Sequence, residues 1–277
     1  MPNILVADDD QNIRQMLRTL LRRGGHSVTL AKDGAAALAQ LQKHNFDLVL
    51  MDVHMPRMGG LEVLAKLREQ GKQPKVIVMT ADNTPETLLS AVREQAHQYV
   101  PKPFGARQLQ EVVDDALSAA EPGGRIEVVS ASPQWVELLV PCAHGVADRI
   151  QGFMTVLKAD LPDELRQSVG QAFREMLLNA IEWGGQFDPT RKVRVSYLRA
   201  QRMLLYRIAD PGAGFRIEDL KHAAVGNPPD DPIRHMQERE EKGLRPGGFG
   251  ILLTRAKVDE VIYNEAHNEV VLVKYLD

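Results

Sequence analysis

The sequence predicts two consecutive α/β domains, and three observations lead to this fold class. The chain has 277 residues, which exceeds the usual size of one domain, so two domains of ~100 to 150 residues are expected. Short apolar runs alternate with helical patterns in the first part of the chain, which predicts a doubly wound, five-stranded parallel sheet. In the second part, strands follow one another directly, which indicates an α/β sandwich with a mixed or antiparallel sheet and helices on one face.

The elements of the first domain follow from hydrophobic periodicity. Continuous apolar runs predict strands at Ile4–Ala7, Val28–Ala31, Phe46–Met51, Val76–Met79 and Gln98–Val100. Helical patterns occur at about 10–23, 34–43, 60–70, 85–95 and 105–119. Open parallel sheets place their sites outside the carboxyl ends of the strands, and four polar residues fall there: Asp8, Asp9, Asp52 and Thr80.

A domain boundary is predicted at Glu121-Pro-Gly-Gly124, because its glycines favour turn conformations that end a helix. The predicted organisation is a first domain at 1–121, a linker at 122–125 and a second domain at 126–277. In the second domain we expect a strand at 126–130, helices at about 134–157 and 163–183, strands at 192–199 and 202–209, a helix at 249–257, and a hairpin of strands 259–264 and 269–276. The polar stretch Glu218–Gly247 is long enough to indicate a functional or disordered loop.

Composition excludes several classes of protein. The net charge of -3 gives no basic footprint for nucleic acid, so no direct nucleic-acid binding is expected. Cys142 is the only cysteine, so neither an intramolecular disulfide nor a thiolate metal cluster can form within one chain. We find no signal peptide and no run of ~18 apolar residues, so the expected location is the cytoplasm, without membrane association.

The first candidate site combines carboxylates with a hydroxyl and an amine. Mg²⁺ prefers oxygen ligands and keeps several waters, so two or three carboxylates suffice to bind it; Asp8, Asp9 and Asp52 supply them. An aspartate that accepts a phosphoryl group must be an exposed nucleophile with positive charge nearby. Lys102, in Tyr99-Val-Pro-Lys102, is the expected cation.

With these motifs in order, residues 2 to about 120 resemble the response-regulator receiver family, which implies a flavodoxin-like fold. The resemblance makes Asp52 the phosphoacceptor. It implies that Asp8, Asp9 and Asp52 hold Mg²⁺, with the backbone carbonyl of His54 as a further ligand. It also implies that Thr80 and Lys102 contact the phosphoryl oxygens and that Tyr99 is the aromatic partner of Thr80. Glutamine at 95 stands where the family usually has glycine, which affects only loop details.

The second candidate site comes from three sequence boxes. Glu175 and Asn179 lie four residues apart in Phe173-Arg-Glu-Met-Leu-Leu-Asn179 and so share one helix face. Two glycine-rich boxes follow, Asp210-Pro-Gly-Ala-Gly-Phe215 and Pro246-Gly-Gly-Phe-Gly250. Glycines let the backbone approach a ligand closely, and amides at a helix start can bind phosphate.

Together these boxes resemble the Bergerat-type (GHKL) ATPase superfamily, which includes histidine kinases, gyrase and the anti-sigma-factor serine-protein kinases. The resemblance spans about 126–277 and implies the cofactors ATP and Mg²⁺, with Asn179 on the metal and Asp210 bonded to the adenine amino group. It implies that glycines border the nucleotide on both sides, Gly212, Gly214, Gly248 and Gly250. It further implies an ATP lid at Glu218–Gly247 and a γ-phosphate contact from Arg245.

The second domain is predicted to transfer a phosphoryl group to a protein, with Glu175 as general base. The alternative for Glu175 is a solvated carboxylate on the helix surface with no chemical role. No two-helix dimerisation segment precedes the ATPase boxes, and His144 lacks an acidic neighbour, so it is expected on a helix surface and not as a phosphoacceptor. The compact arrangement therefore resembles the anti-sigma serine kinases.

The expected partners are a sensor histidine kinase or phosphotransfer protein upstream, and a sigma factor or anti-anti-sigma-type protein downstream. Trp183 stands where the superfamily often has histidine, so a non-catalytic, ATP-dependent binding module is the competing hypothesis. A DNA-binding regulator is disfavoured, because the chain shows neither a helix-turn-helix pattern nor a basic stripe.

The short linker suggests that the last strand and helix of the first domain contact the second domain or another protomer, as in a possible homodimer.

Overall fold

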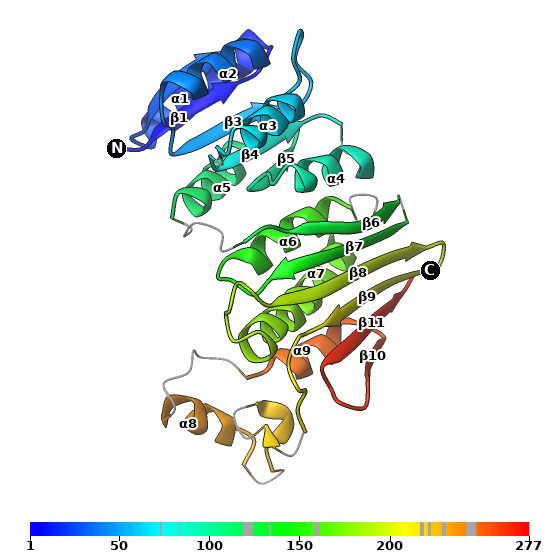
Figure 1. The fold of residues 1–277 in the computed structure, drawn as a ribbon. Coiled ribbons are helices and arrows are strands. Elements are labelled where there is room, and N and C mark those ends of the chain that lie inside the picture. Colours follow the sequence, from blue (N-terminus) through cyan, green and yellow to red (C-terminus); the bar gives the residue numbers. More distant parts are fainter. Residues whose placement is uncertain are drawn as a thin grey trace. The chain divides into compact units, whose positions relative to one another are not determined.

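The computed structural model describes residues 1–72, 74–82, 84–118, 124–132, 134–157, 161–216, 219–220, 223–228, 231–241 and 248–276. The chain divides into two compact units, Met1–Glu121 and Pro122–Asp277 (Figure 1). Among the helices of these described ranges, none is both long enough and apolar enough to cross a bilayer.

The first unit alternates strands and helices throughout. In chain order its elements are β1 (Asn3–Ala7), α1 (Gln11–Arg23), β2 (Ser27–Ala31), α2 (Gly34–Lys43), β3 (Leu48–Asp52), α3 (Gly60–Glu69), β4 (Val76–Thr80), α4 (Pro85–Arg93), β5 (Gln98–Pro101) and α5 (Ala106–Ser118). The sheet has the order β2-β1-β3-β4-β5 and all its pairs are parallel. This is the flavodoxin-like fold, as predicted.

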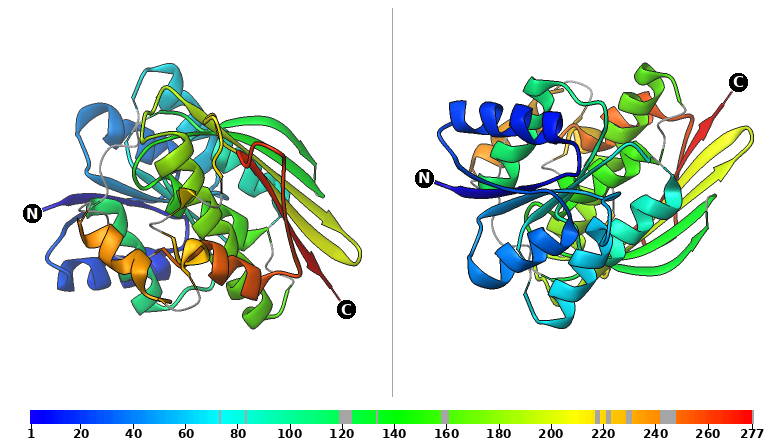
Figure 2. Two further views of the ribbon diagram at one scale, coloured as in Figure 1. Left: turned by 90° about the horizontal axis from the view of Figure 1, so that it is seen from below. Right: turned by 90° about the horizontal axis from the view of Figure 1, so that it is seen from above.

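Helices cover both faces of this sheet (Figure 2), with α1 packed beside α5 and α2 beside α3. One cluster of fully buried side chains joins the sheet to α1 and α5. Its members are Ile4, Val6, Leu17, Leu21, Leu48, Leu50, Ile77, Met79, Val100, Leu109, Val113 and Ala116. Because these strands are buried on both faces, they appear in the sequence as continuous apolar runs.

The second unit is a six-stranded sheet with helices. Its elements are β6 (Glu127–Ser132), β7 (Trp135–Pro141), α6 (Val146–Val156), α7 (Asp163–Asn179), the π-helix η1 (Ala180–Gly184), β8 (Lys192–Ala200), β9 (Met203–Ala209), the 3-10 helix η3 (Ala224–Gly226), α8 (Arg234–Glu241), α9 (Gly250–Lys257), β10 (Glu260–Tyr263) and β11 (Glu269–Tyr275). The strand order is β10-β11-β9-β8-β7-β6, and every pair is antiparallel.

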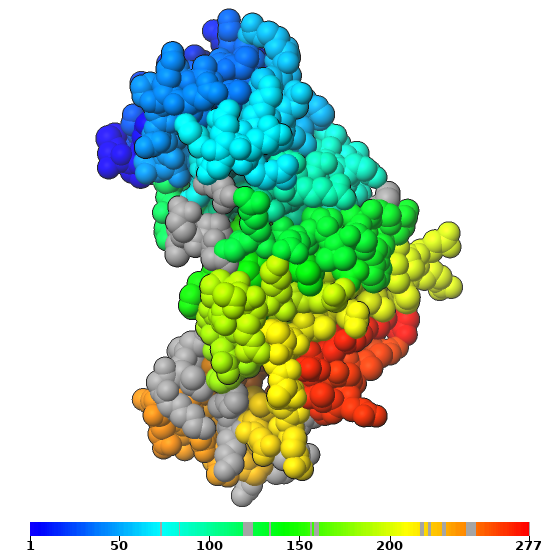
Figure 3. All heavy atoms as spheres, viewed as in Figure 1, coloured from blue at the N-terminus to red at the C-terminus, as the bar shows by residue number. Residues whose placement is uncertain are grey.

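Aromatic side chains join α7 to this sheet. Phe173 of α7 lies 4.7 Å from the ring of Tyr206 on β9, and Tyr206 lies 5.2 Å from Tyr197 on β8. All three side chains are buried, and α6 and α9 pack against α7. β7, β8 and β9 are neighbours in the sheet, and their atoms lie side by side in the green to yellow part of the space-filling view (Figure 3).

The predicted helix at 134–157 is wrong in its first half, because Trp135–Pro141 forms the strand β7. Val136, Leu138 and Val140 are buried while the residues between them are partly exposed, which is the period-2 pattern of a strand. The strand pairs with β6 on one side and β8 on the other. His144 consequently lies in the turn before α6, not on a helix, and stacks on Phe187 with ring centroids 4.0 Å apart.

Two further differences concern the second unit. The helix predicted at 163–183 is α-helical only to Asn179 and continues as a single π-helical turn to Gly184. The polar stretch predicted as a loop contains the helix α8. Residues 218, 221–222, 229–230 and 242–247 of that stretch lie outside the described residues, as do residues 122 and 123 of the predicted linker.

Candidate functional site

The first site is a group of three carboxylates, Asp8, Asp9 and Asp52, which we term the acidic cluster. Asp8 and Asp9 follow β1, and Asp52 ends β3; these strands are neighbours, with Ala7 opposite Met51. One ligand oxygen from each carboxylate lies within 4.8 Å of the other two. Asp8 and Asp52 are buried and Asp9 is exposed. The expectation of an exposed phosphoacceptor is therefore wrong, since the Asp52 side chain is only 7% exposed. Oxygen ligands at this spacing on a partly open surface fit a hard cation such as Mg²⁺.

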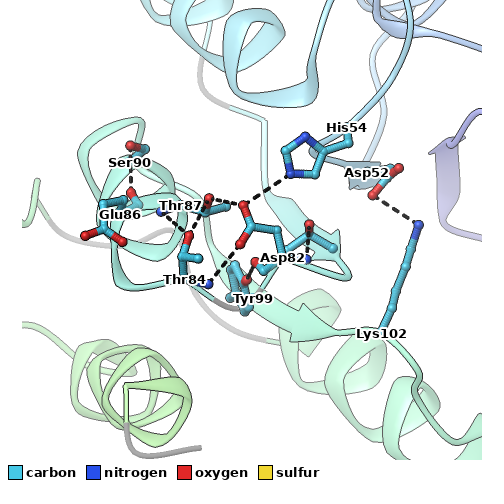
Figure 4. A network of polar contacts seen from close by, with 10 residues as sticks. Asp52, His54, Asp82, Thr84, Glu86, Thr87, Ser90, Tyr99 and Lys102 are labelled. Atoms are coloured by element: carbon cyan, nitrogen blue, oxygen red, sulfur yellow. Dashed lines mark hydrogen bonds and ion pairs between the residues drawn. The ribbon is translucent and has the colours of Figure 1, made fainter. Parts of the chain in front are cut away.

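Lys102 supplies the positive charge at the acidic cluster. It follows β5, and its Nζ lies 2.7 Å from Asp8 Oδ2. Its Nζ also lies 3.0 Å from Asp52 Oδ1, the contact that Figure 4 shows. Burial raises the pKa of Asp52 although the hydrogen bond from Lys102 opposes this, and the charges of Asp8 and Asp9 raise it further. Burial acts to lower the pKa of Lys102, but its hydrogen bonds with Asp8 and Asp52 outweigh it and raise that pKa. The amine therefore remains a cation beside the carboxylates.

Thr80 and Tyr99 belong to a polar network centred on Asp82, and Figure 4 shows the part of it around Asp82 and Tyr99. The backbone N–H of Asp82 donates to Thr80 Oγ1 at 3.0 Å, and the Tyr99 hydroxyl donates to the Asp82 carbonyl at 2.6 Å. Hydrogen bonds from Thr87 and Thr84 lower the pKa of the Asp82 carboxyl to about 2. The predicted pair of Thr80 and Tyr99 is thus joined through a residue that the sequence reasoning missed.

The imidazole of His54 lies with Asp82, since its Nε2 is 3.4 Å from Asp82 Oδ2. This contact and the 64% exposure of the side chain place the ring at the solvent side of the network.

Gly60, the second glycine after Met58, lies against the end of β3. A Cβ at Gly60 would lie 2.1 Å from the carbonyl oxygen of Asp52. Only glycine therefore allows α3 to begin so close to the predicted phosphoacceptor.

The second site is a cavity of about 510 Å³ in the second unit, a volume that fits a small-molecule ligand. It brings together seven of the residues that the three sequence boxes predicted. These are Glu175, Asn179, Asp210, Gly212, Gly214, Gly248 and Gly250. Trp183 also borders the cavity and is 43% exposed, so it forms part of the wall. Arg245 lies outside the described residues.

Asp210 stands at the end of β9 with its carboxylate held in place. Its Oδ1 accepts a hydrogen bond from the Gly212 N–H at 2.7 Å. Burial raises the pKa of this carboxyl, while the Gly212 hydrogen bond and the charge of Arg191 oppose the rise. Gly184 of η1 lies against it, because a Cβ there would be 2.2 Å from Oδ1. A fixed carboxylate that borders a cavity can accept hydrogen bonds from an amino group of a ligand.

Gly250 lies on the Glu175 side of the cavity. A Cβ at Gly250 would be 3.1 Å from Glu175 Oε2 and 3.4 Å from Asn179 Nδ2. Gly250 also begins α9, so the first backbone amides of that helix lie beside Asn179. An amide oxygen that could ligate a metal, next to a helix N-terminus, is an arrangement suited to phosphate groups.

Arg239 was not predicted from the sequence, and it is the only lysine or arginine among the described residues that line the cavity. It comes from α8 and is 6% exposed. Asn227 fixes the start of this helix: its Oδ1 accepts from the His235 N–H at 3.0 Å, and its Nδ2 lies 2.7 Å from His235 Nδ1. The His235 ring in turn contacts Phe249 edge to face at 4.5 Å. Arg239 could have been found only by predicting the helix α8 within the polar stretch Glu218–Gly247, which was predicted as a loop.

Each unit matches a family model. The response regulator receiver domain matches residues 4–114, and the histidine kinase-like ATPase domain matches residues 145–274.

Similar proteins include response regulator MprA of Mycobacterium leprae, 36% identical over 129 residues, which are 47% of this chain and 57% of that protein. Transcriptional regulatory protein ZraR of Salmonella typhimurium is 37% identical over 131 residues, 47% of this chain and 30% of that protein. Among solved structures, chemotaxis protein CheY4 of Vibrio cholerae is 34% identical and covers 42% of this chain and 99% of its own, with a TM-score of 0.41. The chain spans about half or less of the length of these two curated relatives.

Proposed function

Because residues 4–114 form a response-regulator receiver domain and residues 145–274 a histidine kinase-like ATPase domain, we propose that phosphorylation of Asp52 controls an ATP-dependent output. The phosphodonor is a sensor histidine kinase or phosphotransfer protein, and the output domain is a serine/threonine-protein kinase that acts on a sigma factor or an anti-anti-sigma-type protein. The observation that carries the proposal is the presence, in one chain, of the acidic cluster with Lys102 and a cavity bordered by Glu175, Asn179 and Asp210.

In the receiver, Asp52 acts as the nucleophile. One carboxylate oxygen of Asp52 forms a bond to phosphorus while the bond from phosphorus to the donor imidazole breaks, and the imidazole, already protonated on its other ring nitrogen, leaves as the neutral ring. Lys102 neutralises charge on the phosphoryl oxygens, and the Thr80 hydroxyl donates to one of them. Asp8, Asp9, Asp52 and the His54 carbonyl would hold Mg²⁺, which when bound supplies further positive charge at those oxygens.

In the output domain, Asp210 accepts a hydrogen bond from the adenine amino group of ATP. The backbone at Gly212, Gly214, Gly248 and Gly250 allows the nucleotide to lie close. Asn179 would hold Mg²⁺, which when bound neutralises phosphate charge. Glu175 accepts the proton of the attacking hydroxyl as that oxygen bonds to the γ-phosphorus and ADP leaves. Arg239 supports this role for the cavity, because a cation in the cavity lining counters the negative charge of a triphosphate.

A second candidate function is a non-catalytic module that binds its partner in an ATP-dependent way. The observation that favours it is Trp183, a cavity-wall residue where the superfamily often has histidine. In this case ATP shapes the polar segment around α8, and the partner is held or released without chemistry.

A phosphotransfer assay separates the two functions. Protein charged with γ-labelled ATP is incubated with candidate regulatory proteins, and hydroxylamine then removes aspartyl phosphate while serine and threonine phosphate remain. We expect stable label on a partner with the wild type and with Glu164→Gln, an exposed residue in the first turn of α7. Glu175→Gln should lose it. Nucleotide binding without transfer favours the second function, and absence of nucleotide binding contradicts both.

A further inference from the structure

The turn between β10 and β11, residues 264–268, borders the ATPase cavity although none of the three sequence boxes includes it. Residues 263 and 267–270 all line the cavity. We term residues 264–268 the hairpin turn and residues 210–215 the glycine loop. The two segments are about 50 residues apart in the sequence, so their contact is tertiary.

Three hydrogen bonds join the hairpin turn to the glycine loop. The Asp210 N–H donates to the Asn268 carbonyl at 2.8 Å, and the Phe215 N–H donates to the Ala266 carbonyl at 3.1 Å. The Asn268 side chain donates to the Gly212 carbonyl at 3.0 Å. Gly214 has a φ of +85°, and a Cβ there would lie 1.7 Å from the Ala266 oxygen. The glycine loop therefore lies directly against the hairpin turn.

The hairpin turn is itself held rigid by Asn264. Asn264 Oδ1 accepts from the N–H groups of Asn268 and Glu269, each at 3.1 Å, and Asn264 Nδ2 donates to Asn268 Oδ1 at 2.7 Å. The amide of Asn268 is thus oriented on one side by Asn264 and bonded on the other to Gly212. Because Gly212 also donates to the Asp210 carboxylate, this chain of hydrogen bonds runs from the turn to the predicted adenine contact.

The same region carries three mutually packed rings. Phe215 lies 5.8 Å from Tyr263 and 5.3 Å from His267, and Tyr263 lies 5.3 Å from His267. All three residues line the cavity. Aromatic rings beside a ligand cavity favour stacking with a planar base, and a purine offers a larger surface than a pyrimidine.

From these contacts we infer that the hairpin turn selects the base of the nucleotide, with Asn268 as a positioning residue for Asp210 and His267 as part of an aromatic wall for the purine ring. The inference rests on the proposed ATP binding. The carboxylate of Asp210 accepts from the amino group of adenine or cytosine, whereas guanine presents a carbonyl at the corresponding ring position. The aromatic wall separates adenine from cytosine by stacking area. Together the two features select ATP over both GTP and CTP.

The test is the affinity of the full-length chain for ATP, GTP and CTP, measured by calorimetry with thermal unfolding as a check of folding. Asn268→Asp replaces the donor to Gly212 with an acceptor, and it should lower the ratio of ATP to GTP affinity roughly tenfold. His267→Asn removes the ring but suits the φ of +58° at this position. It should lower the ratio of ATP to CTP affinity roughly five- to a hundredfold, and His267→Phe should restore that ratio.

Glu265→Ala, an exposed position in the same turn, serves as the matched control and should leave both ratios unchanged. Unchanged ratios in folded Asn268→Asp and His267→Asn, with wild-type protein binding ATP, would overturn the inference alone. Failure of the wild type to bind any of the three nucleotides would instead contradict the proposed function on which it rests.

Discussion

Gly184→Ala is the substitution whose effect on nucleotide binding follows most directly from the structure. The new Cβ would lie 2.2 Å from Asp210 Oδ1, where ordinary contact begins at 3.4 Å, so the carboxylate or the end of η1 must move by about 1.2 Å. A hydrogen bond lengthened by this amount is lost. A bond to a charged acceptor contributes about 1.5 to 3 kcal/mol, so we expect ATP affinity to fall roughly ten- to a hundredfold.

The affinity is measured by titration calorimetry with a non-hydrolysable ATP analogue and Mg²⁺. The matched control is Gly152→Ala on α6, where no atom lies within 4 Å of the new Cβ. This control should bind the analogue normally and gain up to about 1 kcal/mol of stability from its higher helix propensity. If Gly184→Ala folds and binds the analogue as tightly as the control, the assigned role of the Asp210 carboxylate is incorrect.

Three further predictions concern Lys102, Cys142 and His235. Lys102→Ala leaves Asp8 and Asp52 without their shared cation; labelling of Asp52 by acetyl phosphate should fall roughly a hundredfold, and equal labelling would contradict its role. Cys142 is fully buried and burial raises its pKa to about 11, so a thiol reagent at pH 8 should react at least roughly a hundredfold faster after unfolding in guanidinium; equal rates would refute this. Burial and Arg239 lower the pKa of His235 from 6.5, so below pH 6.5 the unfolded segment takes up a proton that the folded one resists. The measurement is amide hydrogen exchange of α8, corrected for the intrinsic exchange rate at each pH. Protection of α8 should be full above pH 6.5 and decrease below it, and in His235→Gln it should not depend on pH.

The receiver fold could be predicted because its chemistry is local in the sequence. Each parallel strand appears as one apolar run, and Asp8, Asp52 and Lys102 each stand at or just beyond a strand end. Parallel packing then brings these ends to one edge of the sheet. Asp82 was missed because its role depends on hydrogen bonds, from Thr87 to its carboxylate and from the Tyr99 hydroxyl to its backbone carbonyl, which no periodicity reveals.

The errors in the second unit have two physical causes. A short apolar run such as Trp135–Pro141 fits a strand or a helix about equally well by pattern alone, and pairing with β6 and β8 decides in favour of the strand. The helix α8 carries many charges and has little apolar face, so its position depends on tertiary contacts, such as that of His235 with Phe249. Arg239 was missed for the same reason.

The glycines and polar groups that line the cavity were predicted from the sequence, but the hairpin turn that also lines it was not. Asp210, Asn179 and Glu175 stand out because their residue types and spacing are informative. The hairpin turn does not, since Asn268 gains its role through hydrogen bonds with Asp210 and with Gly212, which lies 56 positions away. Long-range contacts of this kind are not encoded in a local pattern.

The central claim, that Asp52 phosphorylation alters nucleotide handling in the second domain, is tested most directly by one comparison. The affinity for Mg²⁺-ATP is measured with and without beryllofluoride, a mimic of the phosphoryl group, in wild type and in Asp52→Asn. We predict a change of roughly fivefold or more in the wild type and none in the variant. Equal affinities in wild type with and without the mimic would contradict the account.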